Sequence, residues 1–180
     1  MHQFISGTFD DAATANKVVD DIMAMDYPLD LITIIMSTQT RNRLWSQPTP
    51  DVKQKKNATS GTLKGQMSDD PIGAIVYACE SDRPDVAPVG TAGAATRLFV
   101  AGPAAVALAS EGVADYTPAR VLRTLARLGM PRFDAERVER DIDSGGIIVG
   151  VITSSNGDRA SLQRIMQKNA ARNVLESMTT

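Results

Sequence analysis

The sequence is poor in the residue types from which metal sites and thiol chemistry are usually built. Among its 180 residues there is one cysteine, Cys79, and one histidine, His2. A lone cysteine excludes an intrachain disulfide and any multi-cysteine metal site, and a lone histidine excludes the histidine-rich zinc and iron motifs. Nothing in the sequence brings His2 next to Cys79, so we interpret the thiol as a small apolar side chain. We therefore expect no metal, no cofactor and no enzymatic activity.

Aromatic residues are also scarce, at 4%, and 19 Lys and Arg nearly balance 21 Asp and Glu. Few aromatics, balanced charge and no recognised motif argue against a nucleic-acid partner. The sequence has neither the long apolar run of a membrane span nor a cleavable leader, so we expect no membrane association. A single free thiol is typical of a reducing compartment. We expect a soluble cytoplasmic protein.

Hydrophobic periodicity predicts a β-α-β unit in the first forty residues. Residues 3–9 and 31–36 are rich in β-branched and aromatic side chains, which is typical of strands. Between them, residues 12–25 carry apolar side chains at helical spacing, and Asp10 offers an N-cap.

A polar stretch then interrupts the pattern. Residues 38–71 contain basic side chains among Gln, Asn, Ser, Thr and Pro, and this composition cannot bury enough apolar surface to order itself. We expect this part to be flexible or ordered by a partner, and residues 72–79 to add a strand or a helical turn. The whole insertion covers residues 38–96.

The second half returns to regular periodicity. The predicted elements are a strand at 98–101, a helix at 104–110, a helix from Pro118, a helix at 133–144, a strand at 147–153, a turn at Asn156–Gly157, a helix at 158–169 and a last short strand near 173–176. Without the insertion, this order is that of a ferredoxin-like split β-α-β sandwich with an extra C-terminal helix. We expect one α+β domain over residues 1–180.

Two parts of the chain resemble a known family. The opening "FISGTFDDAATANKVVDDIMAMDYPLDLITIIMS" and the later "FVAGPAAVALA" and "VLRTLARLGMPRFDAERVERDIDSGGIIVGV" resemble the small bacterial general-stress (heat-induced stress) domain proteins. The residues that carry the resemblance are Gly102-Pro103, Leu128 to Pro131, Glu139 and Gly145-Gly146. The resemblance covers residues 3–37 and 97–153. It implies the fold and an association with stress, and it implies no active site.

Two groups of residues are candidates for binding a protein partner. They are Arg41, Arg43, Leu44 and Trp45 in the insertion, and Arg120, Arg123 and Arg127 on one predicted helix face. A compact basic-aromatic cluster is a common anchor at interfaces, and a basic helix face suits an acidic partner. The alternative for both groups is a solvated surface with local ion pairs.

A second function remains open, that of a sensor for a small anion such as phosphate or a nucleotide. The strand before Gly102 and the helix after it form a strand-glycine-helix start, where free amides bind anions, and Arg97 is nearby in sequence. The alternative is a structural tight turn.

The central strands predict assembly. Residues 31–36 are apolar on both sides, and so are five residues of the last long strand: Ile147, Ile148, Val149, Val151 and Ile152. An antiparallel sheet with one wet face should alternate apolar and polar residues. Either the insertion or another subunit must cover the second face, and we favour homo-oligomerisation through these five residues. The sequence thus predicts a non-enzymatic, oligomer-forming stress-type protein that acts by self-assembly or partner binding.

Overall fold

The structure is a computed structural model of the chain, and it describes residues 3–28, 31–45, 70–80, 98–110, 123, 126 and 132–176. Its centre is a five-stranded antiparallel sheet in the order β3-β2-β4-β1-β5. The strands are β1 (Gln3–Phe9), β2 (Ile32–Ser37), β3 (Leu98–Ala101), β4 (Ile147–Thr153) and β5 (Val174–Glu176). Strand β4 lies between β1 and β2 and is antiparallel to both. The predicted α+β class is confirmed.

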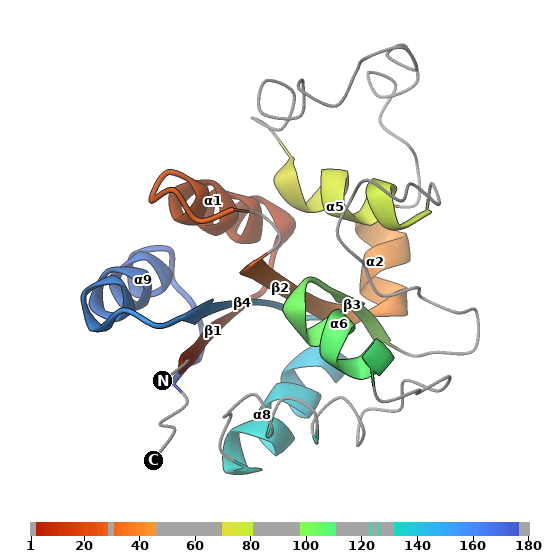
Figure 1. Ribbon diagram of the computed structural model, residues 1–180. Coiled ribbons are helices and arrows are strands. Elements are labelled where there is room, and N and C mark those ends of the chain that lie inside the picture. The colour runs from red at the N-terminus through yellow and green to blue at the C-terminus, as the bar shows by residue number, and fades with distance from the viewer. Residues whose placement is uncertain are drawn as a thin grey trace, which may run out of the picture.

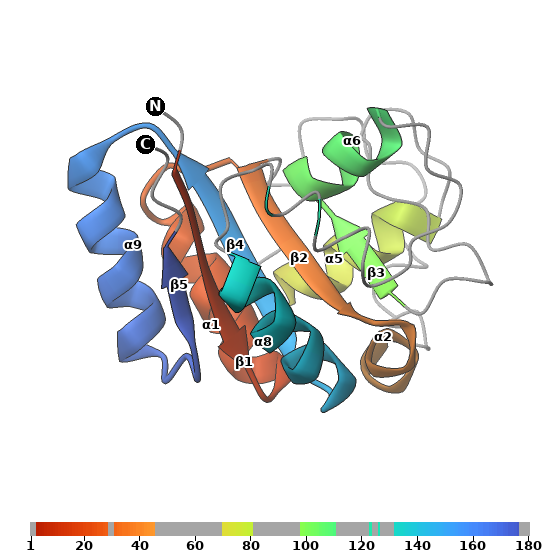
Figure 2. The same cartoon turned by 90° about the horizontal axis from the view of Figure 1, so that it is seen from below.

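Helices cover both faces of the sheet (Figure 1). Helices α1 (Ala12–Met23), α5 (Pro71–Glu80) and α9 (Asn156–Lys168) lie on one side, which we call the first face. Helices α6 (Pro103–Ser110) and α8 (Arg132–Asp143) lie on the other side, the second face. Helix α2 (Thr38–Trp45) follows β2 directly and packs near β3 at the edge of the sheet (Figure 2).

The first face is covered by an almost purely apolar core. The strand side chains in it include Ile5, Phe9, Ile32, Ile34, Met36, Phe99, Ile147, Val149 and Val151. Helix α1 adds Ala15, Val18, Val19 and Ile22, the stripe that the periodicity predicts, and α5 adds Ile72, Ile75 and Val76. Because each strand alternates its side chains, these residues share one side of the sheet.

The second face has a smaller core that mixes apolar and hydroxyl side chains. Its apolar members are Phe4, Ile35, Leu98, Val100, Ala104, Ala105, Val138, Ile142, Ile148 and Leu175. Alternation places Ser6 and Thr8 of β1 and Thr33 of β2 on this same side, and all three are buried. Gly150 leaves room for the Phe4 ring, since a Cβ there would lie 2.2 Å from the Phe4 Cζ atom.

Two helix starts differ from the prediction. Helix α1 is capped by Asp11, not Asp10, because the Asp11 carboxylate accepts the Thr14 backbone N–H at 2.7 Å. Helix α9 begins at Asn156, where we expected a turn, because the Ser155 hydroxyl accepts the Asp158 N–H and provides the N-cap. In both places two adjacent residues are of types that favour the N-cap position, Asp10 and Asp11 before α1 and Ser155 and Asn156 before α9, so the sequence alone does not show which one is the cap.

Two segments of the insertion form helices that its composition does not predict. Residues 38–45 form α2, although we expected 38–71 to be flexible or ordered by a partner. The apolar stretch at 72–79 is part of a full helix, α5. Both helices are stabilised by packing against the first-face core. Three residues of α5 belong to that core, and Trp45 of α2 packs against it.

Candidate functional site

Helix α2 carries the predicted basic-aromatic cluster, and its start is fixed by a local cap. The Ser37 hydroxyl accepts the Thr40 backbone N–H at 2.9 Å and donates to Thr40 Oγ1 at 2.9 Å. Thr40 is buried beneath the helix. The first turn of α2 is therefore held to the end of β2 without any partner molecule.

The other end of α2 is fixed by its tryptophan. The indole Nε1–H of Trp45 donates to both carboxylate oxygens of Asp70, at 3.0 Å and 3.2 Å. Trp45 is half-buried and packs against the first-face core. The indole N–H of Trp45 is thus bonded within its own chain, and the part of Trp45 in partner binding stays a prediction.

Asp70 joins three helices through one carboxylate. Besides Trp45 of α2, its Oδ1 accepts the Asn16 side-chain amide of α1 at 2.8 Å and the Gly73 N–H of α5 at 2.8 Å. Asn16 is buried, and its own carbonyl oxygen accepts the Ile72 N–H at 2.9 Å. Charge-assisted bonds of this kind are among the strongest in proteins, so the Asp70 cluster (Asn16, Trp45, Asp70, Gly73) holds α1, α2 and α5 together.

Between these two fixed ends, α2 presents an exposed surface. Asn42 and Arg43 are exposed, and Leu44 is 37% exposed, one of three large apolar side chains exposed among the described residues. Arg43 Nη2 lies 3.6 Å from the position that a Cβ of Gly145 would take, close to the C-terminal end of α8. We call Asn42, Arg43 and Leu44 the α2 surface. It combines positive charge with an apolar side chain, as the sequence predicts for a binding surface.

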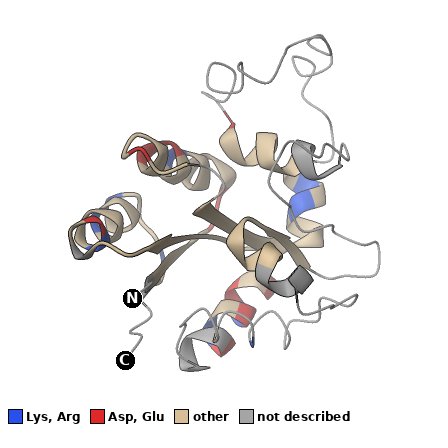
Figure 3. Ribbon diagram, in the orientation of Figure 1, with Lys and Arg blue, Asp and Glu red and all other residues tan. Residues whose placement is uncertain are grey.

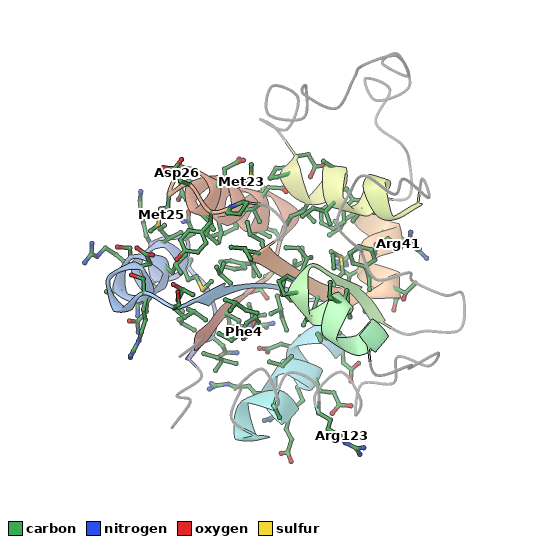
Figure 4. The ribbon with its side chains drawn as sticks, viewed as in Figure 1. Phe4, Met23, Met25, Asp26, Arg41 and Arg123 are labelled. Carbon is green, nitrogen blue, oxygen red and sulfur yellow. The ribbon has the colours of Figure 1, made fainter. Side chains whose placement is uncertain are left out.

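The second predicted basic group is described only at Arg123, which is helical and exposed. Arg120 and Arg127 lie outside the described residues. Figure 4 shows Arg41 and Arg123 at separate places on the molecule. Figure 3 also shows that the positive charges of α2 (blue) lie apart from the negative charges of α1 (red). The two basic groups thus do not form one continuous surface around Arg41 and Arg123.

The strand-glycine-helix start at Gly102 is a structural turn rather than an open anion site. Gly102 has a φ of +78°, and a Cβ there would lie 2.0 Å from the backbone oxygen of Ile32. The first amides of α6 are used within the chain, since Ala104 N–H donates to Thr33 Oγ1 and Ala105 N–H donates to the Gly102 carbonyl. The alternative of a tight turn is therefore the observed one. Arg97, the other predicted anion contact, lies outside the described residues.

The five strand residues expected at a subunit interface are inside the chain itself. Ile147, Val149 and Val151 are in the first-face core, Ile148 is in the second-face core, and Ile152 packs against the latter. This corrects the predicted interface. Among the described residues, the second face is covered neither by the predicted insertion of residues 38–96 nor by another subunit, because α6 and α8 of the second half of the chain occupy it.

The sequence did not reveal a second polar cluster, centred on Asp141 of α8. Its side chain is only 13% exposed. The Oδ2 atom accepts Thr8 Oγ1–H at 3.1 Å and the Asn173 side-chain amide at 2.6 Å, and Arg172 Nη2 lies 3.4 Å from Oδ1. Arg172 also pairs with Asp10 at 3.1 Å. In the sequence, Asp141 stands among the many charged residues of its helix, and nothing there distinguishes it from a surface charge.

One tyrosine shows a perturbed acidity. The Tyr27 hydroxyl lies 2.8 Å from Thr153 Oγ1 and donates to Asp158 Oδ2 at 3.0 Å. Burial raises the pKa of Tyr27 above its ordinary value, and the nearby Asp158 carboxylate acts in the same direction. This contact joins the end of α1 to the start of α9, and its role is to hold the first-face helices together.

Within the described ranges, no group of three or more His, Cys, Asp or Glu side chains is arranged to hold a metal ion. Among the helices of the described part, none is long and apolar enough to cross a membrane. Comparisons of the chain with protein-family models, with curated proteins and with solved structures return no match.

Proposed function

We propose that this protein is a non-enzymatic interaction module of the general-stress type, which acts by self-assembly or by binding a protein partner through the α2 surface. The observation that carries the proposal is the combination of exposed Arg43 and Leu44 on a helix fixed at both ends. A preformed surface loses little conformational entropy on binding, which favours its use as a docking site.

The sheet itself is a poor candidate for the contact surface. Both of its faces are covered by the chain's own helices, and all four residues of the edge strand β3 are buried. Binding therefore relies on helix surfaces. The α2 surface fits this role because an arginine beside an apolar side chain is a frequent combination at the centre of interfaces.

The topology supports the finer fold assignment that we propose, a ferredoxin-like sandwich. Strand β4 between β1 and β2, with α1 and α9 on the same face, is the split β-α-β arrangement. Between β2 and β4 the chain adds α2, α5, β3, α6 and α8. A link to stress rests on the family resemblance, and a cytoplasmic location rests on the single free thiol, which is typical of a reducing compartment.

The proposal is tested by the solution mass of the intact chain and of Leu44→Glu and Arg43→Glu, measured by light scattering over a range of concentrations. We expect the wild-type chain to self-associate and each substitution to weaken association at least about tenfold, because a buried mismatch of charge at an interface centre costs more than 1.4 kcal/mol.

The matched controls are Val106→Glu, at an apolar residue that is 44% exposed on α6, and Arg164→Glu, at an exposed arginine of α9. They remove the same residue types at other sites. If the controls weaken association as much as the α2 substitutions, α2 has no special role. If the wild-type chain is monomeric at every concentration, self-assembly is excluded and only binding of a different protein remains.

A further inference from the structure

Two surfaces of the molecule combine an exposed leucine with charge, and the charges are of opposite sign. Leu44 belongs to the α2 surface, next to exposed Arg43. Leu31, which is 38% exposed, directly precedes β2 and follows the acidic end of α1. Among the described residues, the remaining exposed large apolar side chain is Val106 of α6, a helix without charged residues. The charges beside them therefore distinguish Leu31 and Leu44 from Val106.

The C-terminal end of α1 concentrates negative charge. Asp20 and Asp21 lie in its last turn, which contains no basic residue, and exposed Asp26 follows the helix. The bond that Asp21 accepts, at 3.0 Å, comes from the neutral side-chain amide of Asn169, so it does not neutralise the carboxylate. The carbonyl groups at the end of a helix add partial negative charge at the same place. A cation that approaches this end from outside is therefore attracted to it, although exposed Lys17 lies one turn earlier on α1.

Asp26 and Leu31 are held at the same end of the sheet. Tyr27 follows Asp26 directly, and its hydroxyl lies 2.8 Å from Oγ1 of Thr153 at the end of β4. The start of β2, which Leu31 precedes, pairs with the same part of β4. We call Asp21, Asp26 and Leu31 the α1-end surface. It combines negative charge with an exposed leucine, whereas the α2 surface combines positive charge with an exposed leucine.

The two surfaces cannot meet within one copy of the chain, because β2 separates them. Leu31 directly precedes β2, and α2 directly follows it. The strand has six residues and spans about 20 Å, at about 3.3 Å for each residue. Asp26 and Arg41 of α2 accordingly lie on opposite sides of the molecule in Figure 4, and Figure 2 shows β2 leading into α2. A contact between the two surfaces therefore requires two copies.

We propose that the α2 surface of one copy binds the α1-end surface of a second copy, so that the chain assembles head to tail. Arg43 then faces the carboxylates of the α1-end surface, and Leu44 packs against Leu31. The complementary charge favours this pairing, because two α2 surfaces meeting around a two-fold axis would bring two copies of Arg43 into one interface. The inference deepens the self-assembly part of the proposed function and rests on it.

The head-to-tail contact has a consequence for the size of the assembly. Each bound copy still carries one unused surface of each kind at the ends of the assembly. Contacts of this heterologous type continue into a ring or an open filament, whereas a contact of two identical surfaces ends at a dimer. We therefore expect light scattering of the wild-type chain to show species larger than a dimer as the concentration rises, and fewer of them at high salt.

The first test changes the α1-end surface. Leu31→Lys places a positive charge opposite Arg43 of the next copy, and it should weaken association at least about tenfold, as Leu44→Glu does. The matched control is Val106→Lys, at a side chain of similar exposure, which should leave association as in the wild type. Asp26→Asn removes one charge, keeps a residue type that tolerates the φ of +62° at this position, and should weaken association about threefold.

The second test mixes two variants that each fail to assemble alone. The Leu44→Glu chain keeps an intact α1-end surface, and the Leu31→Lys chain keeps an intact α2 surface. The mixture should therefore form a one-to-one dimer with one intact contact, and it should grow no further. Urea denaturation of both variants should match that of the wild type, since both leucines are exposed.

Three results would count against the inference. Equal effects of Leu31→Lys and Val106→Lys would remove any special role of the α1-end surface. Absence of a complex in the mixture would overturn the head-to-tail arrangement, while weaker association of the α2 variants would still support the proposed function. A wild-type chain that is monomeric at every concentration would overturn this inference, and it would leave the α2 surface only a different protein as its partner.

Discussion

The first and second faces of the sheet are both covered, but they are built from different side chains. On β2 the neighbours Ile34 and Ile35 point to opposite faces, and both are fully buried. Ile34 meets apolar strands and the helices α1 and α5, whereas Ile35 meets a core that includes the hydroxyl of Thr33 and the short helix α6. The exposed fraction of the two side chains therefore does not distinguish their environments. The two environments differ in composition, because the first-face core is almost purely apolar and the second-face core includes hydroxyl side chains.

The largest expected effect uses this pair of isoleucines. Ile34→Ala should cost about 3–5 kcal/mol of unfolding free energy, because the first-face core is packed on all sides and cannot close the cavity. Ile35→Ala should cost about 2 kcal/mol, because the second-face core is smaller and includes hydroxyl side chains, so it depends less on close apolar packing. Urea denaturation of both variants measures the difference. Equal costs would show that the two cores are equally rigid.

A second test adds volume to the second face. Gly150→Ala places a methyl group where the Phe4 ring now lies, and the ring must move, at a cost of about 1–3 kcal/mol. Phe4→Leu in the same chain should recover part of that cost, because the smaller side chain makes room. A loss below about 0.5 kcal/mol for Gly150→Ala would mean that the second face is already loosely packed.

The third test concerns the polar support of the first face. Trp45→Phe keeps an aromatic ring in place but removes the N–H that donates to Asp70, and it should cost about 1–2 kcal/mol. The same substitution in an Asp70→Asn background should cost less, since the carboxylate is already gone. If the two substitutions are additive, the Asp70 cluster does not act as a unit.

A smaller effect is expected at the cap of α1. The Thr14 backbone N–H, followed by the Thr14 hydroxyl, lowers the pKa of Asp11. Asp11→Ala should cost about 1 kcal/mol. Because the folded-state pKa is lowered, this stabilisation is present above about pH 4 and is lost as pH falls through the lowered pKa. Stability curves of the variant and the wild type should converge in acid. Asp10→Ala, at the residue that the sequence suggested as the cap, should cost less.

The smallest effect is a titration. The raised pKa of Tyr27 means that its hydroxyl should ionise above pH 10, and Tyr27→Phe identifies its signal in ultraviolet absorbance. Since the pKa is raised in the folded state, its contribution to stability is complete below about pH 10 and is lost as pH rises through the folded value. Ionisation of Tyr27 at or below pH 10 would show that the buried contact with Asp158 does not persist in solution.

The strands and the main helices follow from local sequence, because burial of a repeated apolar pattern determines them. The predicted strands at 3–9 and 147–153 match β1 and β4, and the stripe from Ala15 to Ile22 faces the core.

The predicted oligomer interface was wrong because the apolar pattern of a strand does not identify its neighbours. A strand that is apolar on both sides indicates that both faces of the sheet are covered, but it does not show whether the covering residues belong to the same chain.

The polar clusters could not be found in the same way. Asp141 contacts Thr8, which is 133 positions away, and Asp70 contacts Asn16, which is 54 positions away. No local spacing encodes such pairs. The same limit applies to Trp45. Local sequence does not show that its N–H donates to Asp70, which lies 25 positions away in the same chain. Exposed Arg43 and Leu44 remain as the predicted surface.

The hydrogen bond between Trp45 and Asp70 joins two residues that are 25 positions apart in sequence. It therefore closes a loop of the covalent chain that begins at the end of α2 and ends just before α5. The entropy of closing such a loop grows only with the logarithm of its length, so doubling the length costs about 0.6 kcal/mol. The position of α2 against α5 thus depends more on the contact between Trp45 and Asp70 than on the length of the chain that links the two helices.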